Sequence, residues 1–463
     1  MAERTAGPMA ERIVVHADPA LIQPVAGGMA GRREHRRPAL SRLTQLTGTT
    51  FADEHWGRRP LLVRRADAHG FADLLDLDGV DELLSRRGLR TPFLRLARAG
   101  VVADSSTFTG SGGVGAEVAD QVVDHKVAAL FAGGSSVVLQ ALHRNWPAVI
   151  DFTGALAGEL GHPVQANAYI TPPSSQGFTA HYDVHDVFVL QLAGTKEWTI
   201  HAPVHPDPLR DEPWNLHAAA VAARARDEEP VLETVLEPGD VMYLPRGWLH
   251  AATALGGVCA HLTIGVHVVT RFALVQALMA LVANDPQLRA SLPLGLDVAD
   301  PAQLEPSLRQ VRQVLAQALD RVDADAVTRS VRRRVWSGSA PEPIRPIAGF
   351  GFAQGLSVGD RVRLRGGLGH RLVQRDGDVV LELAGRQIRF PIAVTPALDA
   401  LLAGPDVAVG QLPGLPDDDQ LVLVRRLLGE GVLVPGELTS GELASGEVAS
   451  AELASGELAS GLR

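Results

Sequence analysis

The sequence predicts an α+β protein in which a double-stranded β-helix, or jelly roll, is followed by a helical region and a winged-helix-like C-terminal domain. Three observations predict this order. Eight short strand-like runs separated by turn residues lie between residues 164 and 268, as in a jelly roll. Helical periodicity returns after Thr270. Residues 345–435 then alternate short strands and helices, which suggests a small winged-helix-like unit.

The first part of the chain divides into an arm and a domain. Residues 1–40 mix proline, glycine and arginine without periodicity, so we expect a disordered arm. The first domain, expected over residues 41–270, begins with short helices and a strand at Pro60–Val63, then a helix over Glu117–Ala132 and a strand over Ser135–Leu142. The eight strand-like runs follow, at Val164–Ile170, Thr179–Asp183, Val187–Leu192, Glu197–His201, Leu232–Leu236, Val241–Leu244, Trp248–Thr253 and Val258–Val268.

The helical region, expected over residues 271–344, carries one apolar stripe at helical spacing. Its members are Leu308, Val311, Leu315, Ala318, Leu319 and Val322. A stripe of this kind packs against a partner. That partner is either a second copy of the chain or the interior of a helix bundle, and the residues alone leave both readings open.

The C-terminal unit, residues 345–435, contains both strand and helix candidates. The candidates are strands at Arg361–Leu364, Val379–Leu383, Gln387–Phe390 and Val432–Val434, with helices at Pro396–Leu402 and Asp418–Leu428. The second helix begins among acidic residues that would repel phosphate, so we expect no direct DNA binding. The tail, residues 436–463, repeats a pentapeptide of mostly small residues and is expected to be disordered.

The composition narrows the function classes. A formal net charge of −10 argues against general nucleic-acid binding. The single cysteine, Cys259, cannot form a disulfide within the chain and fits a reducing cytoplasm. The longest apolar helical run, Phe272–Ala283, is shorter than the ~20 residues that span a bilayer. We therefore expect a cytoplasmic protein with no membrane partner.

Two histidines and an aspartate are candidate ligands of one metal ion. In the His181-Tyr182-Asp183 motif, the first and third side chains point to the same face of a predicted strand. A later motif with a proline and two glycines ends at His250, which can return beside this pair if the strands close into a barrel. Two imidazoles and one carboxylate on one face leave three positions open, as in non-haem iron(II) oxygenases.

Other readings of these residues stay open. A lone His-x-Asp arises often by chance, because most histidines are simply hydrogen-bonded by their neighbours. His185 lies on the same predicted strand face as His181, and we expect it to line the pocket, with a direct metal bond as the lesser alternative. A zinc hydrolase or isomerase would use the same ligand set.

Lysine is almost absent, since only Lys126 and Lys196 occur among 43 basic residues. Lys196 follows an Ala-Gly-Thr turn, and a hairpin there would place it near the strand of the candidate ligands. A surface salt bridge is the ordinary role of a lysine, but the scarcity of lysine favours a specific one. A buried ammonium needs an anion, which the distal carboxylate of 2-oxoglutarate would supply. Asn167 and Tyr169 alternate on the preceding strand and face the same interior.

Several motifs occur together along residues 43–435. They are Phe51-x4-Trp56-x3-Pro60-Leu61-Leu62, Asn167-x-Tyr169-x-Thr171-Pro172-Pro173, Gln176-Gly177-Phe178, His181-Tyr182-Asp183 and Leu244-Pro245-Arg246-Gly247. Together they resemble the cupin-like JmjC ribosomal oxygenases, a family of protein hydroxylases. The resemblance implies a JmjC or cupin catalytic domain, a helical dimerisation region that makes a homodimer, and a winged-helix-like domain.

The resemblance also implies roles for individual residues. It implies that Fe(II) is held by His181, Asp183 and His250, and that the co-substrate 2-oxoglutarate is bound by Lys196. It places Asn167 and Tyr169 near co-substrate and substrate. His261-Leu262-Thr263 matches a further family strand, which makes Thr263 a candidate co-substrate contact, although Gly265 stands where some members have a serine.

The sequence thus favours a 2-oxoglutarate-dependent dioxygenase that hydroxylates a protein side chain. The resemblance implies that this side chain is a histidine or arginine of a ribosomal protein. Demethylation of N-methyl-lysine would use the same chemistry and is an alternative. A cupin that binds metal or a partner without oxygenase activity is a second alternative. A zinc hydrolase is a third, and it leaves Lys196 unexplained.

Overall fold

The computed structural model describes residues 14–16, 39–67, 69–98, 100–173, 175, 179–404 and 406–436. The tail from residue 437, most of the N-terminal arm and the Gln176-Gly177-Phe178 motif lie outside the described residues, so the expected disorder of arm and tail stays a prediction there. Within the arm, β1 (Val14–His16) pairs in parallel with β2 (Leu61–Arg64), so the expectation of a wholly disordered arm is wrong at this point. The chain divides into two compact units, residues 1–339 and 340–463.

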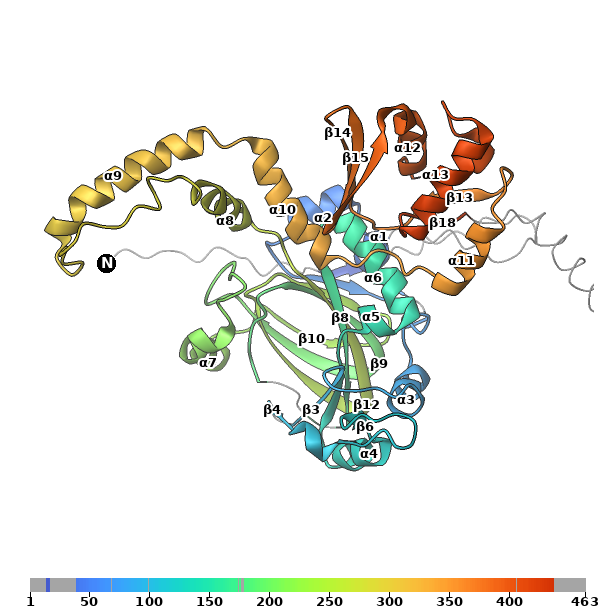
Figure 1. The fold of residues 1–463 in the computed structure, drawn as a ribbon. Helices are drawn as coiled ribbons and strands as arrows, with labels where there is room; N and C mark the ends of the chain where they lie inside the picture. The colour runs from blue at the N-terminus through green and yellow to red at the C-terminus, as the bar shows by residue number, and fades with distance from the viewer. Residues whose placement is uncertain are drawn as a thin grey trace, which may run out of the picture. The chain divides into compact units, whose positions relative to one another are not determined.

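The first unit is organised around one large sheet of ten strands. Its central strands are β8 (Val164–Thr171), β9 (Asp186–His201), β10 (Leu232–Leu236), β11 (Val241–Leu244) and β12 (Leu249–Val266). On one edge of β9, the first half pairs with β11 and the second half pairs with β10. On its other edge β9 pairs with β12 along both halves, and the second half of β12 also pairs with β8. The sheet therefore curves around one interior, as the predicted jelly roll requires (Figure 1).

The long strands correct the predicted hairpin. No hairpin turn forms at Ala193–Thr195, because β9 runs through it, with Gly194 at a φ of 61°. The two runs at Trp248–Thr253 and Val258–Val268 likewise join into β12, whose register shifts between Leu255 and Ala260. Glycines that look like turn residues in the sequence instead allow a bulge, through which the ladder continues. The predicted strand Thr179–Asp183 is also wrong, since only an isolated bridge between His181 and His250 forms there.

Short elements precede the central strands. The helices are α1 (Ala39–Thr44), α2 (Gly48–Glu54), α3 (Leu77–Arg86), α4 (Asp124–Ala132), α5 (Leu142–Asn145) and α6 (Pro147–Leu160). The strands are β2, β3 (Leu94–Arg98), β4 (Val101–Val102), β5 (Thr109–Gly110), β6 (Gln121–Val122) and β7 (Ser136–Leu139). The strand predicted at Pro60–Val63 is thus confirmed, apart from its first residue. The helix predicted from Glu117 begins only at Asp124, because residues 121–122 form β6, and the strand predicted to Leu142 ends at Leu139.

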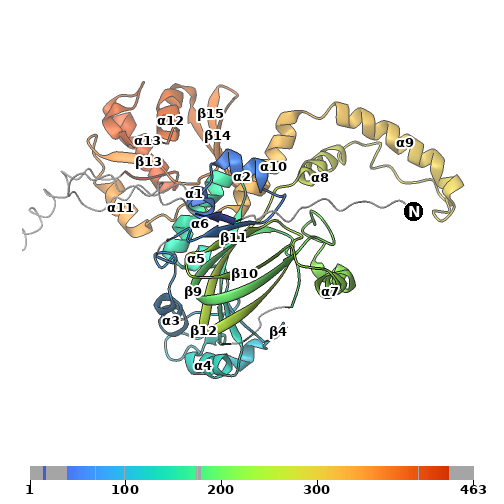
Figure 2. The same ribbon diagram turned by 180° about the vertical axis from the view of Figure 1, so that it is seen from behind.

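The core of this unit lies between the sheet and the helices outside it. β8 alternates, and its residues Ala166, Ala168 and Ile170 join the main apolar cluster together with Val149 and Leu156 of α6. Burying each large apolar side chain contributes about 1.5–3 kcal/mol, so this face holds the barrel together. The intervening residues of β8 are left for the barrel interior. α7 (Ala218–Asp227) lies on the side of the barrel away from α3 (Figure 2).

The helical region consists of α8 (Arg271–Val282), α9 (Pro301–Asp320) and α10 (Ala324–Gly338). The predicted apolar stripe falls on α9, except for Val322, which follows it. Ala318 is buried, but Leu308 and Val311 are 36% and 41% exposed. The stripe is therefore covered only in part by the chain itself. None of the helices in the described ranges is both long and apolar enough to cross a membrane.

The second unit has its own core and two small sheets. Its strands are β13 (Arg361–Leu364), β14 (His370–Arg375), β15 (Asp378–Leu383), β16 (Arg386–Pro391), β17 (Val407–Ala408) and β18 (Leu433–Pro435), and its helices are α11 (Pro346–Gln354), α12 (Thr395–Leu402) and α13 (Asp417–Gly429). All six predicted elements occur within one residue of their expected ends, whereas α11, β14 and the two-residue strand β17 were missed. The winged-helix assignment itself stays a prediction.

Candidate metal centre

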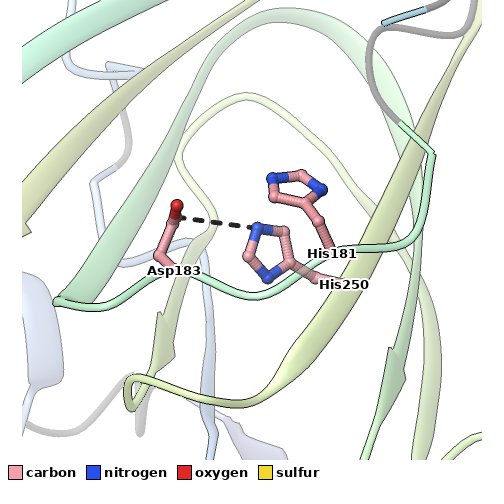
Figure 3. A group of neighbouring side chains, drawn as sticks. All are labelled: His181, Asp183 and His250. Carbon is pink, nitrogen blue, oxygen red and sulfur yellow. Dashed lines mark ion pairs between the residues drawn. The ribbon is translucent and has the colours of Figure 1, made fainter. Parts of the chain in front are cut away.

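The three predicted metal ligands meet at one point of the first unit. Their ligand atoms all lie within 4.8 Å of one another. Oδ2 of Asp183 is 3.8 Å from Nε2 of His250, and the centroids of the two histidine rings are 4.4 Å apart. Figure 3 shows the carboxylate and one imidazole facing each other, with His181 beside them. The structure therefore brings together the side chains that the sequence motifs selected.

His250 is the second residue of β12, whereas backbone contacts outside any regular strand hold His181 and Asp183. The amide of His250 donates to the carbonyl of His181 at 2.8 Å, and the reverse bond is 3.2 Å. The amide of Gly247 donates to the carbonyl of Asp183 at 3.0 Å. Gly247 has a φ of 87°, and an added Cβ would lie 2.8 Å from the carbonyl oxygen of His205. This turn needs glycine for both reasons, so the glycine of the second motif positions the site.

Carbonyl oxygens fix the tautomers of both histidines. Nδ1 of His181 lies 2.8 Å from the carbonyl of Thr179, and Nδ1 of His250 lies 3.1 Å from the carbonyl of Trp248. Because a carbonyl only accepts, each Nδ1 carries a proton, and in the neutral ring the lone pair is then on Nε2. Hydrogen bonds of this kind orient the histidine ligands of metals in proteins.

The charges of the three groups suit a divalent cation. Burial raises the pKa of Asp183, but the neighbouring His185, His250 and His181 outweigh it, and the net shift is downward. Burial and the adjacent His181 lower the pKa of His250 to about 4. At neutral pH the site therefore offers an ionised carboxylate beside a neutral imidazole, which is the protonation state that metal ligands require.

Lys196 is buried without a protein anion. The residue is 4% exposed, and its Nζ lies 3.4 Å from Nδ1 of His261 and 5.8 Å from the ring centroid of Trp198. Burial lowers its pKa to about 8. Among the described residues, no carboxylate forms an ion pair with it, so the surface salt bridge is excluded for this part of the chain. An ammonium in such a place calls for an acidic ligand.

The other predicted pocket residues share one face of the sheet. Strand pairing sets Asn167 beside Thr263 and Tyr169 beside His261. The Tyr169 and His261 rings stack with centroids 5.0 Å apart and planes within 3°. Burial and the charge of Asp183 raise the pKa of Tyr169 to about 12, so it stays a hydroxyl donor. Oδ1 of Asn167 accepts from the amide of Ala141 at 3.0 Å, which leaves its amide group as a donor.

Two residues of the pocket were missed as site residues by sequence reasoning. His261 and Trp198 form the walls around Lys196, and their rings meet edge to face at 5.5 Å. Their signal was present in the alternation of each strand, because His261 is two residues from Thr263 and Trp198 is two residues from Lys196. His185, expected to line the pocket, lies close enough to Asp183 to lower its pKa.

Residues 152–274 match the family described as JmjC domain. Ribosomal oxygenase 1 of Rattus norvegicus is 30% identical over 252 residues, which cover 53% of this chain and 40% of the rat protein. A Drosophila persimilis protein named bifunctional lysine-specific demethylase and histidyl-hydroxylase NO66 is 28% identical over 275 residues, covering 56% of this chain and 37% of that protein. The chain thus spans only 37–40% of the length of these curated relatives.

A solved structure shows the same fold. The crystal structure of the Escherichia coli ribosomal oxygenase YcfD matches with a TM-score of 0.50 and 20% sequence identity. The match covers 84% of this chain and 98% of the other. Because this match covers 84% of the chain, the likeness extends beyond residues 152–274, which match the JmjC domain.

Proposed function

Because this chain carries a JmjC domain like that of the ribosomal oxygenases, we propose that it is an iron(II)- and 2-oxoglutarate-dependent oxygenase that hydroxylates a protein side chain. One observation carries the proposal: a His-Asp-His cluster and a buried lysine without a protein anion share one barrel. The cluster suits a divalent metal ion and the lysine suits an organic acid. A hydrolytic zinc site explains the first feature and not the second.

The metal would be held by Nε2 of His181, a carboxylate oxygen of Asp183 and Nε2 of His250. Three ligands on one side leave positions for a bidentate keto acid and for oxygen. When bound, iron(II) supplies oxidative chemistry that couples conversion of 2-oxoglutarate to succinate and carbon dioxide with insertion of one oxygen atom into a C–H bond. The carbonyl partners of His181 and His250 keep both rings in the ligating tautomer.

The distal carboxylate of 2-oxoglutarate would pair with Nζ of Lys196. The hydroxyl of Tyr169, kept protonated by its raised pKa, is a second donor on the same face. His261 and Trp198 exclude water from the lysine, which strengthens the ion pair that forms there. Asn167 and Thr263 lie on neighbouring paired positions, and we assign them to the floor between this end and the metal.

The names of the relatives guide the choice of substrate. Two relatives are named ribosomal oxygenase and one is named histidyl-hydroxylase. We infer that this chain acts on a histidine or arginine side chain of a ribosomal protein, and these names support the ribosomal protein and the histidine. The Drosophila name also includes lysine-specific demethylase, so release of formaldehyde from N-methyl-lysine is the second candidate.

We propose three functional parts in the chain: a catalytic domain over residues 41–270, a dimerisation region over residues 271–344 and a winged-helix-like domain over residues 345–435. Exposure of Leu308 and Val311 on α9, and of Phe272 and Val275 on α8, supports a homodimer. The acidic start of α13 supports the absence of direct DNA binding. The single cysteine supports a cytoplasmic location.

Reconstitution with iron(II) tests the activity. Purified chain with 2-oxoglutarate is expected to form succinate, and His181→Ala and Lys196→Ala are each expected to abolish it. His125→Ala is the matched control, because that histidine is exposed on α4. Full turnover in either site variant would refute the assignment. Mass spectrometry of ribosomal proteins from cells with and without the chain should show a gain of about 16 Da, the mass of one inserted oxygen.

A further inference from the structure

A group of polar side chains lies at the end of the barrel opposite Lys196. Gln165 is four residues before Tyr169 on β8, so the two are about 13 Å apart along the strand. Gly265 pairs with Gln165 on β12, and His185 and His267 lie beside them. His185 is two residues from Asp183 and is the nearby group that most lowers its pKa. This group therefore flanks the candidate metal centre on the side away from the lysine.

His185 presents a buried hydrogen-bond donor. Nε2 of the Gln165 amide lies 3.3 Å from Nε2 of His185. Because an amide NH₂ group only donates, the imidazole accepts at Nε2 and carries its proton on Nδ1. That Nδ1 is buried and has no hydrogen-bond partner among the described residues. A buried donor without an acceptor is costly, so its acceptor is expected to arrive with a ligand.

Glycine at position 265 provides the space for this pair. A Cβ added there would lie 3.0 Å from Cε1 of His185 and 3.2 Å from Cγ of Gln165. A side chain at this position would crowd both residues, which would have to shift to make room. The sequence therefore keeps a place for the His185–Gln165 pair that a serine or alanine would fill.

A neighbouring histidine and two carboxylates surround this pair. The rings of His185 and His267 meet edge to face at 5.4 Å, and burial, His185 and Arg210 lower the pKa of His267 to about 4. The nearby carboxylates are already engaged, since Asp183 belongs to the metal cluster and Asp186 accepts from Tyr243 and the amide of Arg246. A guanidinium only donates, so it offers no acceptor for the Nδ1 hydrogen of His185.

We propose that His185, oriented by Gln165, donates its Nδ1 hydrogen to an acceptor atom of the substrate side chain and selects a neutral acceptor over a cationic one. A neutral imidazole fits this site, and a guanidinium or ammonium does not. The inference rests on the proposed function and sharpens it, because it favours histidine over arginine and methyl-lysine as the residue modified.

A binding experiment tests the inference without any turnover. The chain is loaded with 2-oxoglutarate and with redox-inert Zn(II) in place of iron(II), and the ring nitrogens of isotope-labelled histidines are followed by NMR. N-acetyl-histidine methylamide is expected to shift the Nδ1 resonance of His185, and N-acetyl-arginine methylamide is expected to leave it unchanged. An equal response to both probes, no response to either, or undiminished binding of the histidine probe in His185→Leu would overturn the proposal.

Variants separate substrate binding from co-substrate binding. With overlapping peptides that tile the ribosomal proteins of the source organism, His185→Leu is expected to raise the KM for the modified peptide by about tenfold to a hundredfold. His185→Asn keeps a donor near the position of Nδ1 and should recover most of this loss. Gly265→Ser should weaken peptide binding as well, because it displaces the pair. The dissociation constant for 2-oxoglutarate, measured by calorimetry, should stay within about twofold in all three variants.

The results of these experiments distinguish a failure of the proposed oxygenase activity from a failure of the proposed role of His185. If no peptide is modified while the NMR probe binds at His185, the proposed oxygenase activity fails and the recognition site stands. If peptides are modified at arginine, or if His185→Asn loses as much affinity as His185→Leu, the activity stands and this inference fails.

Discussion

The barrel interior and the helical region leave opposite kinds of groups without protein partners. In the barrel, the described residues offer no acidic partner to the buried ammonium of Lys196 and no hydrogen-bond partner to the buried Nδ1 of His185. In the helical region, Leu308 and Val311 are apolar side chains that remain exposed to solvent. Unpaired buried polar atoms call for a small polar ligand, whereas exposed apolar stripes call for another protein surface.

Removing a metal ligand should have the largest effect. His181→Ala deletes one of two imidazoles from the cluster, and the remaining pair cannot hold the ion in the same geometry. We expect loss of stoichiometric metal, measured by elemental analysis after dialysis, and a fall in succinate formation of about a thousandfold or more, beyond the 10–100-fold typical of changes around the ligands. Retention of metal in this variant would show that the ion binds elsewhere.

Removing the buried ammonium should come next. Lys196→Met keeps the length of the side chain and leaves the carboxylate of 2-oxoglutarate buried without a partner. Breaking a buried charge pair costs about 3–5 kcal/mol, so the dissociation constant for 2-oxoglutarate, measured by calorimetry, should rise at least about a hundredfold. Metal content should not change, because Lys196 is not one of the clustered ligands. An unchanged affinity for 2-oxoglutarate would place the acid in another part of the barrel.

Substitutions on the exposed stripe of the helical region should change the oligomeric state of the chain rather than its catalytic activity. Leu308→Asp with Val311→Asp puts two charges on the exposed stripe of α9, and each apolar side chain removed from an interface costs about 1.5–3 kcal/mol. We expect a dimeric wild-type chain and a monomeric variant by analytical ultracentrifugation. Val422→Asp on α13 is the matched control, because Val422 is also exposed. A monomeric wild-type chain would assign the stripe to a different partner.

The smallest expected effect is a pH dependence of co-substrate binding. Burial lowers the pKa of Lys196 to about 8, next to His261 and Cys259. The carboxylate binds the charged form, so affinity should be constant below about pH 7 and fall about tenfold per pH unit above about pH 8. Folding stability should rise over the same alkaline range, because the unfolded chain holds this proton more tightly. Lys196→Met should show neither dependence, and a wild-type affinity that is flat to pH 10 would contradict the assignment.

The sequence predicted local chemistry better than long-range pairing. The His-x-Asp motif and the glycine-containing turn before His250 identified the cluster, because their spacing and residue types are local features. The hairpin before Lys196 was wrong, because Gly194 accommodates a bulge in a strand held by its neighbours β10 and β12. Lys196 nevertheless reaches the interior. The prediction of a specific role for it did not depend on the hairpin, because it rested on the scarcity of lysine in the sequence.

Other features could not be predicted because they depend on contacts between distant segments. The space that Gly265 leaves for His185 and Gln165 depends on three segments meeting, and nothing in any one of them shows it. The missed helix α11 contains glycines and a proline, which weaken its helical signal. The start of α4 was misplaced because residues 121–122 pair with β5, and a two-residue ladder leaves no periodicity to detect.

Anaerobic visible spectroscopy tests the central claim most directly. An α-keto acid that chelates iron(II) through its keto and carboxylate oxygens gives a charge-transfer band, so the wild-type chain mixed with iron(II) and 2-oxoglutarate should develop this band at one equivalent of metal. His181→Ala should show no band, and Lys196→Met should develop the band only at a much higher concentration of 2-oxoglutarate. A wild-type chain that binds iron(II) and shows no such band would contradict the account.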